Sequence, residues 1–368
     1  MIRLAELNYH CHTEYSKPEE VIEKHKLSSG FIHFIKDRVD LLLVKHLNYE
    51  GGAVIEGIRY AFFKTLNRSW YVPFKTHRFL KKENPDIILV QGFVFPLQVI
   101  FLKWKLGKGC KIIAQHHGER PFSGIKGRLQ QRADAFVDGY LFTSLDNAEP
   151  WLSKKIISSK EKCFEVLSAS TGFVLRDKEA CKRKLNISGN DNFLWVARLN
   201  NNKDPLSVLI AFEKYLAVNR RAALYMIYQT DELLTMIEHM KNVSPHLNNA
   251  VHLIGRIDHE QLPDWYSAVE FYISGSHSEG SGYALAEAMA CGCIPVVTAI
   301  PSFIKIAGKY GIFFKPGDPE VLYEKLVSTG SLDKEKYAQE IRLYAGENLS
   351  YKAVADQLYR LCSSLISE

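Results

Sequence analysis

Around residue 280 the chain reads Ser274-Gly-Ser-His-Ser-Glu279-Gly-Ser-Gly-Tyr-Ala-Leu-Ala-Glu287-Ala-Met-Ala-Cys-Gly292. This stretch follows a short apolar run at Phe271–Ile273, passes through a turn rich in glycine and serine, and becomes helix-like near Gly282. Backbone N–H groups at a helix start have no partners within the helix, so they suit a phosphate or an anionic leaving group. The order of elements therefore predicts an anion-binding helix start directly after a strand.

Glu287 lies in that helix among apolar neighbours, so we expect its carboxylate at the wall of a binding site. A buried carboxylate needs partners, and the paired hydroxyls of a ribose would supply them. Taken singly, Glu279 or Glu287 would more often be an exposed residue or a helix cap. Their spacing after this turn favours a functional interpretation.

A second loop with the same placement is Arg198-Leu-Asn-Asn-Asn-Lys203, which follows the apolar run Phe193–Ala197. Two cations at the carboxyl end of a strand, just before a helix, can neutralise a diphosphate without a metal ion. A lone basic residue in a loop is usually solvated. The combination with the glutamate stretch favours a diphosphate site.

Outward from these loops, short apolar runs alternate with amphipathic segments along the whole chain, which is typical of parallel sheets with helical crossovers. In the first part the predicted strands are Ile2–Leu7, Val39–Val44, Ile87–Val90, Lys111–Ala114, Tyr140–Thr143 and Phe164–Leu167. In the second part they are Phe193–Ala197, Ala222–Tyr228, Val251–Ile254, Phe271–Ile273, Ile294–Val297 and Ile312–Phe314.

Helix-like segments of the first part are Pro18–Asp37, Tyr71–Glu83, Pro96–Leu106 and Asp146–Ser158. We predict an α/β protein with two Rossmann-like domains, residues 1–187 and 188–368, whose parallel sheets face a central cleft. The terminal helix could pack back on the N-terminal domain. Ligands of such sheets bind beyond the carboxyl ends of the strands.

The absence of several well-known sequence motifs disfavours several classes of enzyme. The 368 residues contain no GxGxxG fingerprint, no P-loop, no DxD pair, no HExxH and no GxSxG elbow, which disfavours dehydrogenases, P-loop phosphotransferases and common hydrolases. Asp258-His-Glu260 is a weak candidate for metal ligation, and a polar loop opening the next helix is the better interpretation. No metal site and no resident cofactor are predicted.

Composition favours a soluble globular protein of the cytosol. Hydrophobic residues make up 46% and charged residues 24%, and seven scattered cysteines form no zinc-type pair or disulfide framework. Glu6 and His10 interrupt any export signal, and the longest apolar stretch, Ile87–Leu102, is too short to span a membrane.

Up to Lys184 the chain has 31 Lys and Arg against 20 Asp and Glu, so its first part is basic although the net charge is only +6.

The second part resembles the family 4 retaining glycosyltransferases of the GT-B fold. Glu279 and Glu287 match the E-x7-E motif of that family, and Arg198 with Lys203 matches its paired basic residues. Ala290-Cys-Gly-Cys-Ile-Pro-Val-Val297 resembles its A-x-G-x-P-V-V strand, and Val251-His-Leu-Ile-Gly-Arg-Ile followed by Leu262-Pro-Asp-Trp-Tyr resembles the preceding stretch. The resemblance covers roughly 193–322.

That resemblance implies a nucleotide-sugar donor, most often a UDP- or GDP-sugar, as a substrate held by the second domain. Glu287 would bind the ribose, Arg198 and Lys203 the diphosphate, and Glu279 the donor sugar near the reacting carbon. The phosphate or sugar would meet the backbone amides of the helix start, which are those of Ser281, Gly282 and Tyr283. Transfer would proceed with retention and without a metal ion.

A further candidate lies in the first part, where Ile112-Ile-Ala-Gln-His116-His117-Gly118 ends a predicted strand. The resemblance implies a histidine that contacts the donor sugar, and His117 fits this role better than His116. Two ordinary loop histidines are the alternative. On the acceptor side, Asn8–Glu14 and Ser168–Gly172 depart from the glycine-rich loop and the linker sequence of the family.

We therefore expect a retaining glycosyltransferase that acts on a glycan or lipid-linked acceptor in polysaccharide or glycolipid synthesis. The alternatives are a nucleotide-sugar epimerase of the same architecture and a non-catalytic nucleotide-sugar-binding subunit. Basic and bulky residues at Tyr71–Lys82 and Phe101–Lys108 would allow peripheral contact with an anionic face of the cytoplasmic membrane, or would simply pack on the sheet. Nucleic-acid binding is not expected, because no recognition module is present.

Overall fold

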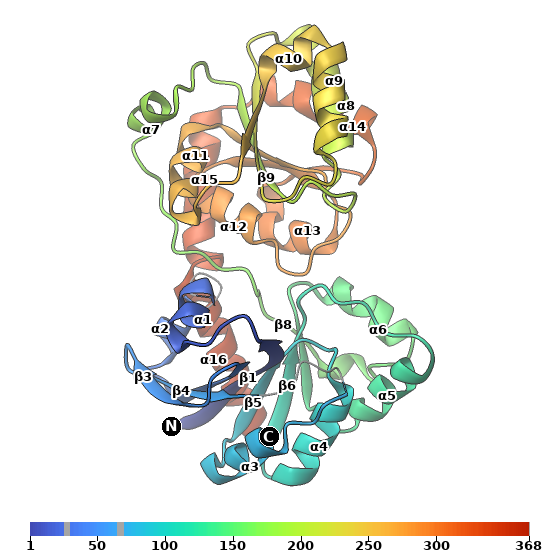
Figure 1. Ribbon diagram of the computed structural model, residues 1–368. Helices are drawn as coiled ribbons and strands as arrows, with labels where there is room; N and C mark the ends of the chain where they lie inside the picture. Colours follow the sequence, from blue (N-terminus) through green and yellow to red (C-terminus); the bar gives the residue numbers. More distant parts are fainter. Residues whose placement is uncertain (26–29, 65–69, 368) are drawn as a thin grey trace. The chain divides into compact units, whose positions relative to one another are not determined.

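The structure is a computed structural model that describes residues 1–25, 30–64 and 70–367. The chain forms two compact units (Figure 1). Unit 1 consists of Met1–Ser168 together with the C-terminal segment from Tyr351, and unit 2 consists of Ala169–Ser350. Each unit is built on a largely or wholly parallel sheet with helical crossovers, so the predicted α/β class with two Rossmann-like sheets is confirmed.

The sheet of unit 1 has eight strands in the order β3-β4-β2-β1-β5-β6-β7-β8. The strands are β1 (Ile2–His12), β2 (Val39–Leu47), β3 (Gly51–Ile55), β4 (Ile58–Phe63), β5 (Ile87–Gln91), β6 (Lys111–Gln115), β7 (Gly139–Phe142) and β8 (Cys163–Glu165). All neighbours pair in parallel except β3 and β4, which form an antiparallel hairpin. This hairpin adds to the six strands that the sequence predicts here.

Helices cover both faces of this sheet. They are α1 (Pro18–His25), α2 (Ile32–Ile35), α3 (Phe74–Glu83), α4 (Pro96–Leu106), α5 (Gly124–Asp134), α6 (Glu149–Ser153) and α16 (Tyr351–Ser367). The helix expected over Pro18–Asp37 is two shorter helices, and residues 26–29 of that range lie outside the described residues. The helix expected from Tyr71 begins at Phe74, after Pro73, and α5 was not predicted.

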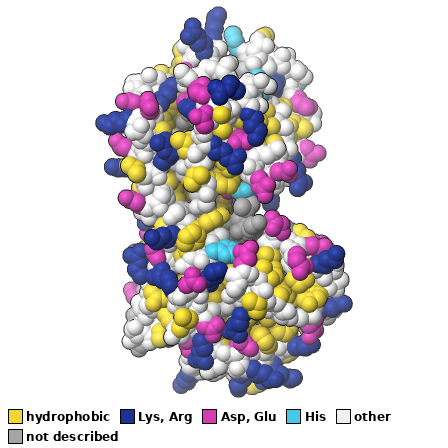
Figure 2. Space-filling view, turned by 90° about the vertical axis from the view of Figure 1, so that its left-hand side faces the viewer, with side chains coloured by type: hydrophobic (Ala, Val, Ile, Leu, Met, Phe, Trp, Pro, Cys, Tyr) yellow, Lys and Arg dark blue, Asp and Glu magenta, His cyan; other side chains and the backbone are white. Residues whose placement is uncertain are grey.

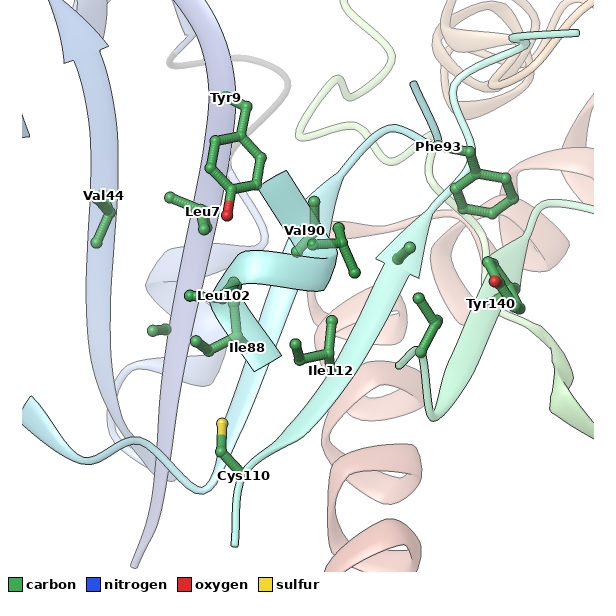
Figure 3. Packing of buried hydrophobic residues seen from close by; sticks show 14 of the residues in the cluster. Leu7, Tyr9, Val44, Ile88, Val90, Phe93, Leu102, Cys110, Ile112 and Tyr140 are labelled. Atoms are coloured by element: carbon green, nitrogen blue, oxygen red, sulfur yellow. The ribbon is translucent and has the colours of Figure 1, made fainter. Parts of the chain in front are cut away.

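Alternate residues of the strands enter two separate hydrophobic clusters because successive side chains of a strand point to opposite faces. Leu7, Val44, Val90 and Ile112 join the cluster that contains Leu102 of α4 (Figure 3). On the other face, a cluster of strand residues is closed by side chains of α2 and α16. These helical residues are Ile32, Ile35, Ala355, Leu358, Cys362 and Leu365.

The sheet of unit 2 has six strands in the order β11-β10-β9-β12-β13-β14, all parallel. They are β9 (Asn192–Ala197), β10 (Ala223–Tyr228), β11 (Val251–Gly255), β12 (Phe271–Ser274), β13 (Ile294–Thr298) and β14 (Ile312–Phe314). The sequence predicts all six. Buried parallel strands are nearly continuous apolar runs, which makes them easy to recognise.

Two groups of helices flank that sheet (Figure 1). One contains α8 (Pro205–Val218), α9 (Leu234–Val243), α10 (Pro245–Ala250) and α14 (Pro319–Ser328). The other contains α7 (Lys178–Leu185), α11 (Leu262–Ala268), α12 (Tyr283–Ala290), α13 (Pro301–Ala307) and α15 (Lys334–Asn348). Among the described residues, no helix combines the length and the apolar character needed to cross a bilayer.

The division between the units differs from the expected boundary at 187/188. It falls after Ser168, and the chain returns to unit 1 at Tyr351. The segment around α7 belongs to unit 2 because α7 packs on α11 and because this segment supplies cations to buried carboxylates of unit 2. The Nη1 atom of Arg176 and the Nζ atom of Lys184 each lie 2.6 Å from Asp264, and the Nζ atom of Lys182 lies 3.2 Å from Glu270.

Two histidines are buried in unit 1 beside β1. His46 is 1% exposed and its ring nitrogens lie 2.8 Å from the Asn8 carbonyl oxygen and 2.9 Å from the Thr76 hydroxyl. His77 is 0% exposed and its Nε2 atom lies 2.9 Å from the hydroxyl of Tyr9. Burial lowers the pKa of each ring to about 4, because water is not available to solvate an imidazolium there.

We predict that unit 1 loses stability as the pH falls from about 6.5 toward 4. The pKa of each histidine is lower in the folded state than the ordinary value of 6.5, so the unfolded chain binds protons first. The contribution is fully present above pH 6.5 and amounts to about 3 kcal/mol per histidine. Thermal unfolding at neutral and mildly acidic pH should show a smaller acid-induced fall in midpoint for His77→Gln than for wild type.

The matched control is His239→Gln, which changes an exposed histidine of α9. That variant should keep the wild-type pH dependence. An unchanged pH dependence of His77→Gln, with the protein folded, would show that His77 does not contribute.

Candidate active site

The carboxyl ends of β9 and β12 meet at the point where the strand order of unit 2 reverses. From β9 the chain builds outward through β10 to β11, then returns to the other side of β9 with β12 and continues through β13 to β14. The loops after β9 and β12 therefore leave the sheet in different directions, and such switch points are where open α/β sheets bind ligands. Both predicted site segments, 198–203 and 275–283, lie at this switch point.

The loop after β12 brings Glu279 to Lys203 of the loop after β9. Their side chains form an ion pair, and the Ser276 hydroxyl lies 2.9 Å from the same Oε1 atom of Glu279. The Glu279 backbone carbonyl accepts a hydrogen bond of 2.7 Å from the Ser302 hydroxyl of α13. Glu279 is thus held by its side chain and its main chain, and it remains half-buried rather than enclosed.

Further contacts join the same two loops to each other. The backbone N–H of His277 donates to the Asn202 carbonyl at 2.8 Å, and the Asn202 side-chain amide donates to the Ser278 carbonyl at 3.0 Å. The His277 ring lies 3.0 Å from Asp204, whose other carboxylate oxygen caps the N-terminus of α8. The two loops form one hydrogen-bonded structure although they lie far apart in the sequence.

Glycine is required at two positions of this structure. A Cβ atom on Gly275 would lie 2.8 Å from the Asp204 carbonyl oxygen, so a side chain there would push the loops apart. Gly282 has φ +76°, and a Cβ atom on it would lie 2.6 Å from Ile306 of α13. The close approach of the backbone at Gly282 sets the position of the α12 N-terminus.

Figure 1 labels α12, and Ser281, Gly282 and Tyr283 lie at its N-terminal end, where the sequence predicts a helix start. Gly282 is the N-cap residue and Tyr283 is the first residue of the helix. The first turn of α12 contains no acidic residue, so the positive end of the helix dipole is not neutralised within that turn. This helix end suits an anion.

Glu287 lies one helical turn further along α12 and is 7% exposed. Its Oε1 atom lies 2.7 Å from His259 Nε2, and its Oε2 atom accepts a hydrogen bond of 3.3 Å from the Tyr266 hydroxyl. Burial first, and then the charge of Glu287, raises the pKa of the Tyr266 hydroxyl well above its ordinary value, so this group stays a donor. Each carboxylate oxygen of Glu287 retains acceptor capacity for a further hydroxyl.

His259 was not among the predicted site residues. It lies in the polar segment Asp258-His-Glu260 that precedes α11, and its ring packs on Phe173 with the ring centroids 4.9 Å apart. The contact with Glu287 is not visible in the sequence, because it joins residues of separate elements. The nearby Leu262-Pro-Asp-Trp-Tyr segment does indicate the site in the sequence, because it resembles a family segment and contains Tyr266, the other partner of Glu287.

Arg198 and Lys203 differ in their surroundings. Lys203 is half-buried and paired with Glu279, whereas Arg198 is exposed directly after β9. In the part of the chain that the structure describes, the Arg198 guanidinium makes no hydrogen bond or ion pair. The predicted pair of cations is therefore one anchored ammonium and one guanidinium available to a ligand.

In unit 1, the two candidate histidines after β6 occupy different environments. His116 is 5% exposed, lies among the rings of Phe93, Phe142 and Trp151, and contacts the Glu119 carbonyl at 3.0 Å. Burial lowers the pKa of His116. His117 is exposed beyond the strand end, with its Nε2 atom 2.6 Å from Gln91 Oε1 of β5. Of the two, His117 is the one placed to meet a ligand of unit 1.

Within residues 1–25, 30–64 and 70–367 there is no group of three or more His, Cys, Asp or Glu side chains arranged to hold a metal ion.

Comparisons with solved structures identify the fold. Sucrose-phosphate synthase from Thermosynechococcus elongatus is 16% identical, with a TM-score of 0.69 and coverage of 99% of each chain. HepE from Anabaena in complex with UDP is 13% identical, with a TM-score of 0.72 and coverage of 99% of this chain and 100% of the other. An E. coli structure described as trehalose-6-phosphate bound with UDP-2-fluoro glucose is 11% identical, with a TM-score of 0.72 and 99% coverage of each chain.

A search of curated proteins gives no match. The family model described as "Glycosyl transferases group 1" matches residues 177–345, a range that contains Arg198, Lys203, Glu279 and Glu287. The structures above share the two-domain GT-B fold with this chain. The chain thus has the GT-B fold, and its residues 177–345 are similar to the glycosyl transferases group 1 family.

Proposed function

We propose that this protein is a retaining glycosyltransferase that moves a hexosyl or related sugar from a nucleotide-sugar donor to a glycan or lipid-linked acceptor, in polysaccharide or glycolipid synthesis. The observation that carries the proposal is the β9/β12 switch point. It gathers Lys203, Glu279, the start of α12 and the doubly held Glu287 within residues 177–345. Neighbouring folds with bound UDP or a UDP-sugar analogue support a nucleotide-sugar as the donor.

The diphosphate of the donor would lie at the N-terminus of α12. Its negative charge would face the helix dipole and the amides of Ser281, Gly282 and Tyr283, and Arg198 and Lys203 would supply the cations. The bond that breaks joins the sugar to this diphosphate, so charge grows on the phosphate oxygen in the transition state. Fixed donors and cations at that oxygen would stabilise it without a metal ion.

Glu287 would accept hydrogen bonds from the two ribose hydroxyls. His259 and Tyr266 hold one oxygen each, which fixes the plane of the carboxylate before the ligand arrives. Glu279 would contact the donor sugar beside the reacting carbon. From unit 1, His117 is the proposed histidine contact to that sugar, because His116 is buried in the core.

The donor site is tested by thermal unfolding with UDP, GDP, ADP, CMP and dTDP. A ligand that binds only the folded state raises the unfolding midpoint. At a ligand concentration one hundred times its dissociation constant, the free energy of unfolding rises by about 2.7 kcal/mol. We expect one nucleotide, UDP or GDP, to stabilise the wild type and to lose this effect in Arg198→Ala and Glu287→Gln. A metal chelator should leave the stabilisation unchanged.

Arg256→Ala is the matched control, because Arg256 is an exposed arginine after β11 rather than β9. This variant should respond to the nucleotide as the wild type does. If no nucleotide at millimolar concentration stabilises the wild type, the donor site is wrongly assigned.

His259 gives a sharper prediction about ribose recognition. Replacing it with Ala leaves Glu287 held only by Tyr266, so the hydrogen bonds from Glu287 to ribose should weaken. For wild type we expect the nucleotide that binds, UDP or GDP, to bind about tenfold or more tighter than its 2′-deoxy form, the range for a hydrogen bond to a charged group. In His259→Ala this ratio should fall several-fold, and His259→Gln, which can still donate to Glu287, should restore part of it. Equal ratios in wild type and His259→Ala would contradict the assignment.

Retention is tested separately through the product. With a matching α-linked donor and acceptor, the anomeric coupling constant in the proton NMR spectrum of the initial product should be that of an α-linkage. A β-linked initial product would show inversion. Consumption of the donor to an epimer without any acceptor would favour the epimerase alternative.

A further inference from the structure

Three consecutive crossover helices of unit 1, α3, α4 and α5, lie side by side against one face of the sheet (Figure 1). Phe74 of α3 contacts Phe101 of α4 edge to face, with ring centroids 5.6 Å apart. On their inner sides, Leu80, Val99 and Leu102 belong to the hydrophobic core, and Ala133 of α5 is buried as well. Their outer sides have no assigned role in the glycosyltransferase site.

The exposed charged side chains of these three helices are all cationic. They are Lys75, Arg78, Lys81 and Lys82 of α3 and Lys126, Arg128 and Arg132 of α5. Of these, Lys75 forms an ion pair with Glu50, the residue before β3. The two acidic residues are withdrawn, since Glu83 is half-buried against Arg59 at 2.9 Å and Asp134 is 4% exposed beside Lys162 at 3.1 Å. Figure 2 shows basic side chains along the lower end of unit 1, where Figure 1 places α3 and α4.

Large apolar side chains stand among these cations. Trp104 of α4 is 77% exposed, Ile125 of α5 is 80% exposed and Phe74 is 57% exposed. Single exposed apolar residues are common on protein surfaces. Here each of three adjacent helices has one large exposed apolar side chain, and the same surface has an excess of positive charge. This combination favours a partner that is both anionic and apolar.

We propose that this basic-aromatic face, formed by the outer sides of α3, α4 and α5, binds the surface of an anionic phospholipid bilayer. The cations would pair with lipid phosphates, and Trp104, Phe74 and Ile125 would enter the boundary between headgroups and acyl chains. Tryptophan in particular is enriched at that depth. A nucleic acid would use the cations but would leave Ile125 in water, because an aliphatic side chain offers no ring on which a base could stack.

This inference goes beyond the proposed transfer reaction and rests on different residues. It is tested by flotation of the full-length protein with phosphatidylcholine vesicles and with vesicles that contain phosphatidylglycerol as well. We expect binding only to the anionic vesicles, and weaker binding at high salt because the ionic contribution is screened. Lys81→Ser/Lys82→Ser should reduce partitioning about tenfold or more, since each cation near an anionic surface contributes about a factor of five.

Trp104→Ser should also weaken vesicle binding, by removing an apolar contact rather than a charge. The matched controls lie in unit 2 and replace residues of the same kinds: Arg220→Ser/Arg221→Ser changes two adjacent exposed arginines, and Val218→Ser changes an apolar side chain that is 61% exposed. Both controls should bind vesicles like the wild type. Every variant changes exposed positions, so all should unfold at the wild-type temperature and keep the wild-type response to nucleotide.

Absence of binding to anionic vesicles would overturn the proposal while leaving the donor site untouched. Equal loss of binding in the unit 2 controls would also overturn it, because the attraction would then follow net charge alone. Binding to a polyanion such as RNA that is insensitive to Trp104→Ser, without binding to vesicles, would assign the face to a nucleic acid instead.

Discussion

The pairing of β9 with β12 is the constraint on which the candidate site depends. The rings of Phe193 and Phe271 stack with their centroids 4.6 Å apart, and these two residues are also register partners in the sheet. Because the strands are parallel neighbours, their carboxyl ends lie at one edge and the loops that follow are forced together. The ion pair between Lys203 and Glu279 and the backbone contact between His277 and Asn202 are consequences of this pairing. Chemistry at the switch point thus depends on an apolar contact inside the sheet.

In both units, buried carboxylates are paired with lysine or arginine side chains. Glu6 of β1 faces Lys45 of β2 at 2.6 Å, Asp264 faces Arg176 and Lys184, and Glu270 faces Lys178 and Lys182. Removing one member of such a pair is costly because the remaining charge stays out of water. Glu287 is different, since it is buried between a histidine and a tyrosine and has no lysine or arginine partner among the described residues. A carboxylate that accepts hydrogen bonds from such donors can still bind a ligand, whereas a carboxylate in a buried ion pair serves the stability of the fold.

The strands of unit 2 and the segments of its site are predictable from the sequence, because buried parallel strands and a glycine-rich turn leave local patterns. The hairpin β3–β4 and helix α5 are not predictable in this way, because β3 is only partly buried and the α5 sequence GIKGRLQQRAD has few apolar residues. The expected domain boundary is too late in the chain because the ion pairs of α7 with Asp264 and Glu270 join distant residues. The contact of His259 with Glu287 was out of reach for the same reason, and only burial separates His116 from His117. Local patterns predict elements, whereas pairing across elements needs the structure.

The return of the chain to unit 1 at Tyr351 has a consequence for synthesis on the ribosome. Thr171 and Ser350 form a bridge, so the two ends of unit 2 lie together and the unit is inserted as a closed module into unit 1. When Ser168 has left the exit tunnel, one face of the eight-stranded sheet still lacks Ala355, Leu358, Cys362 and Leu365. The nascent first unit must therefore wait, with an apolar face uncovered, until the whole inserted module and α16 have been translated. The hydrophobic core on that face is therefore complete only once α16 has been translated.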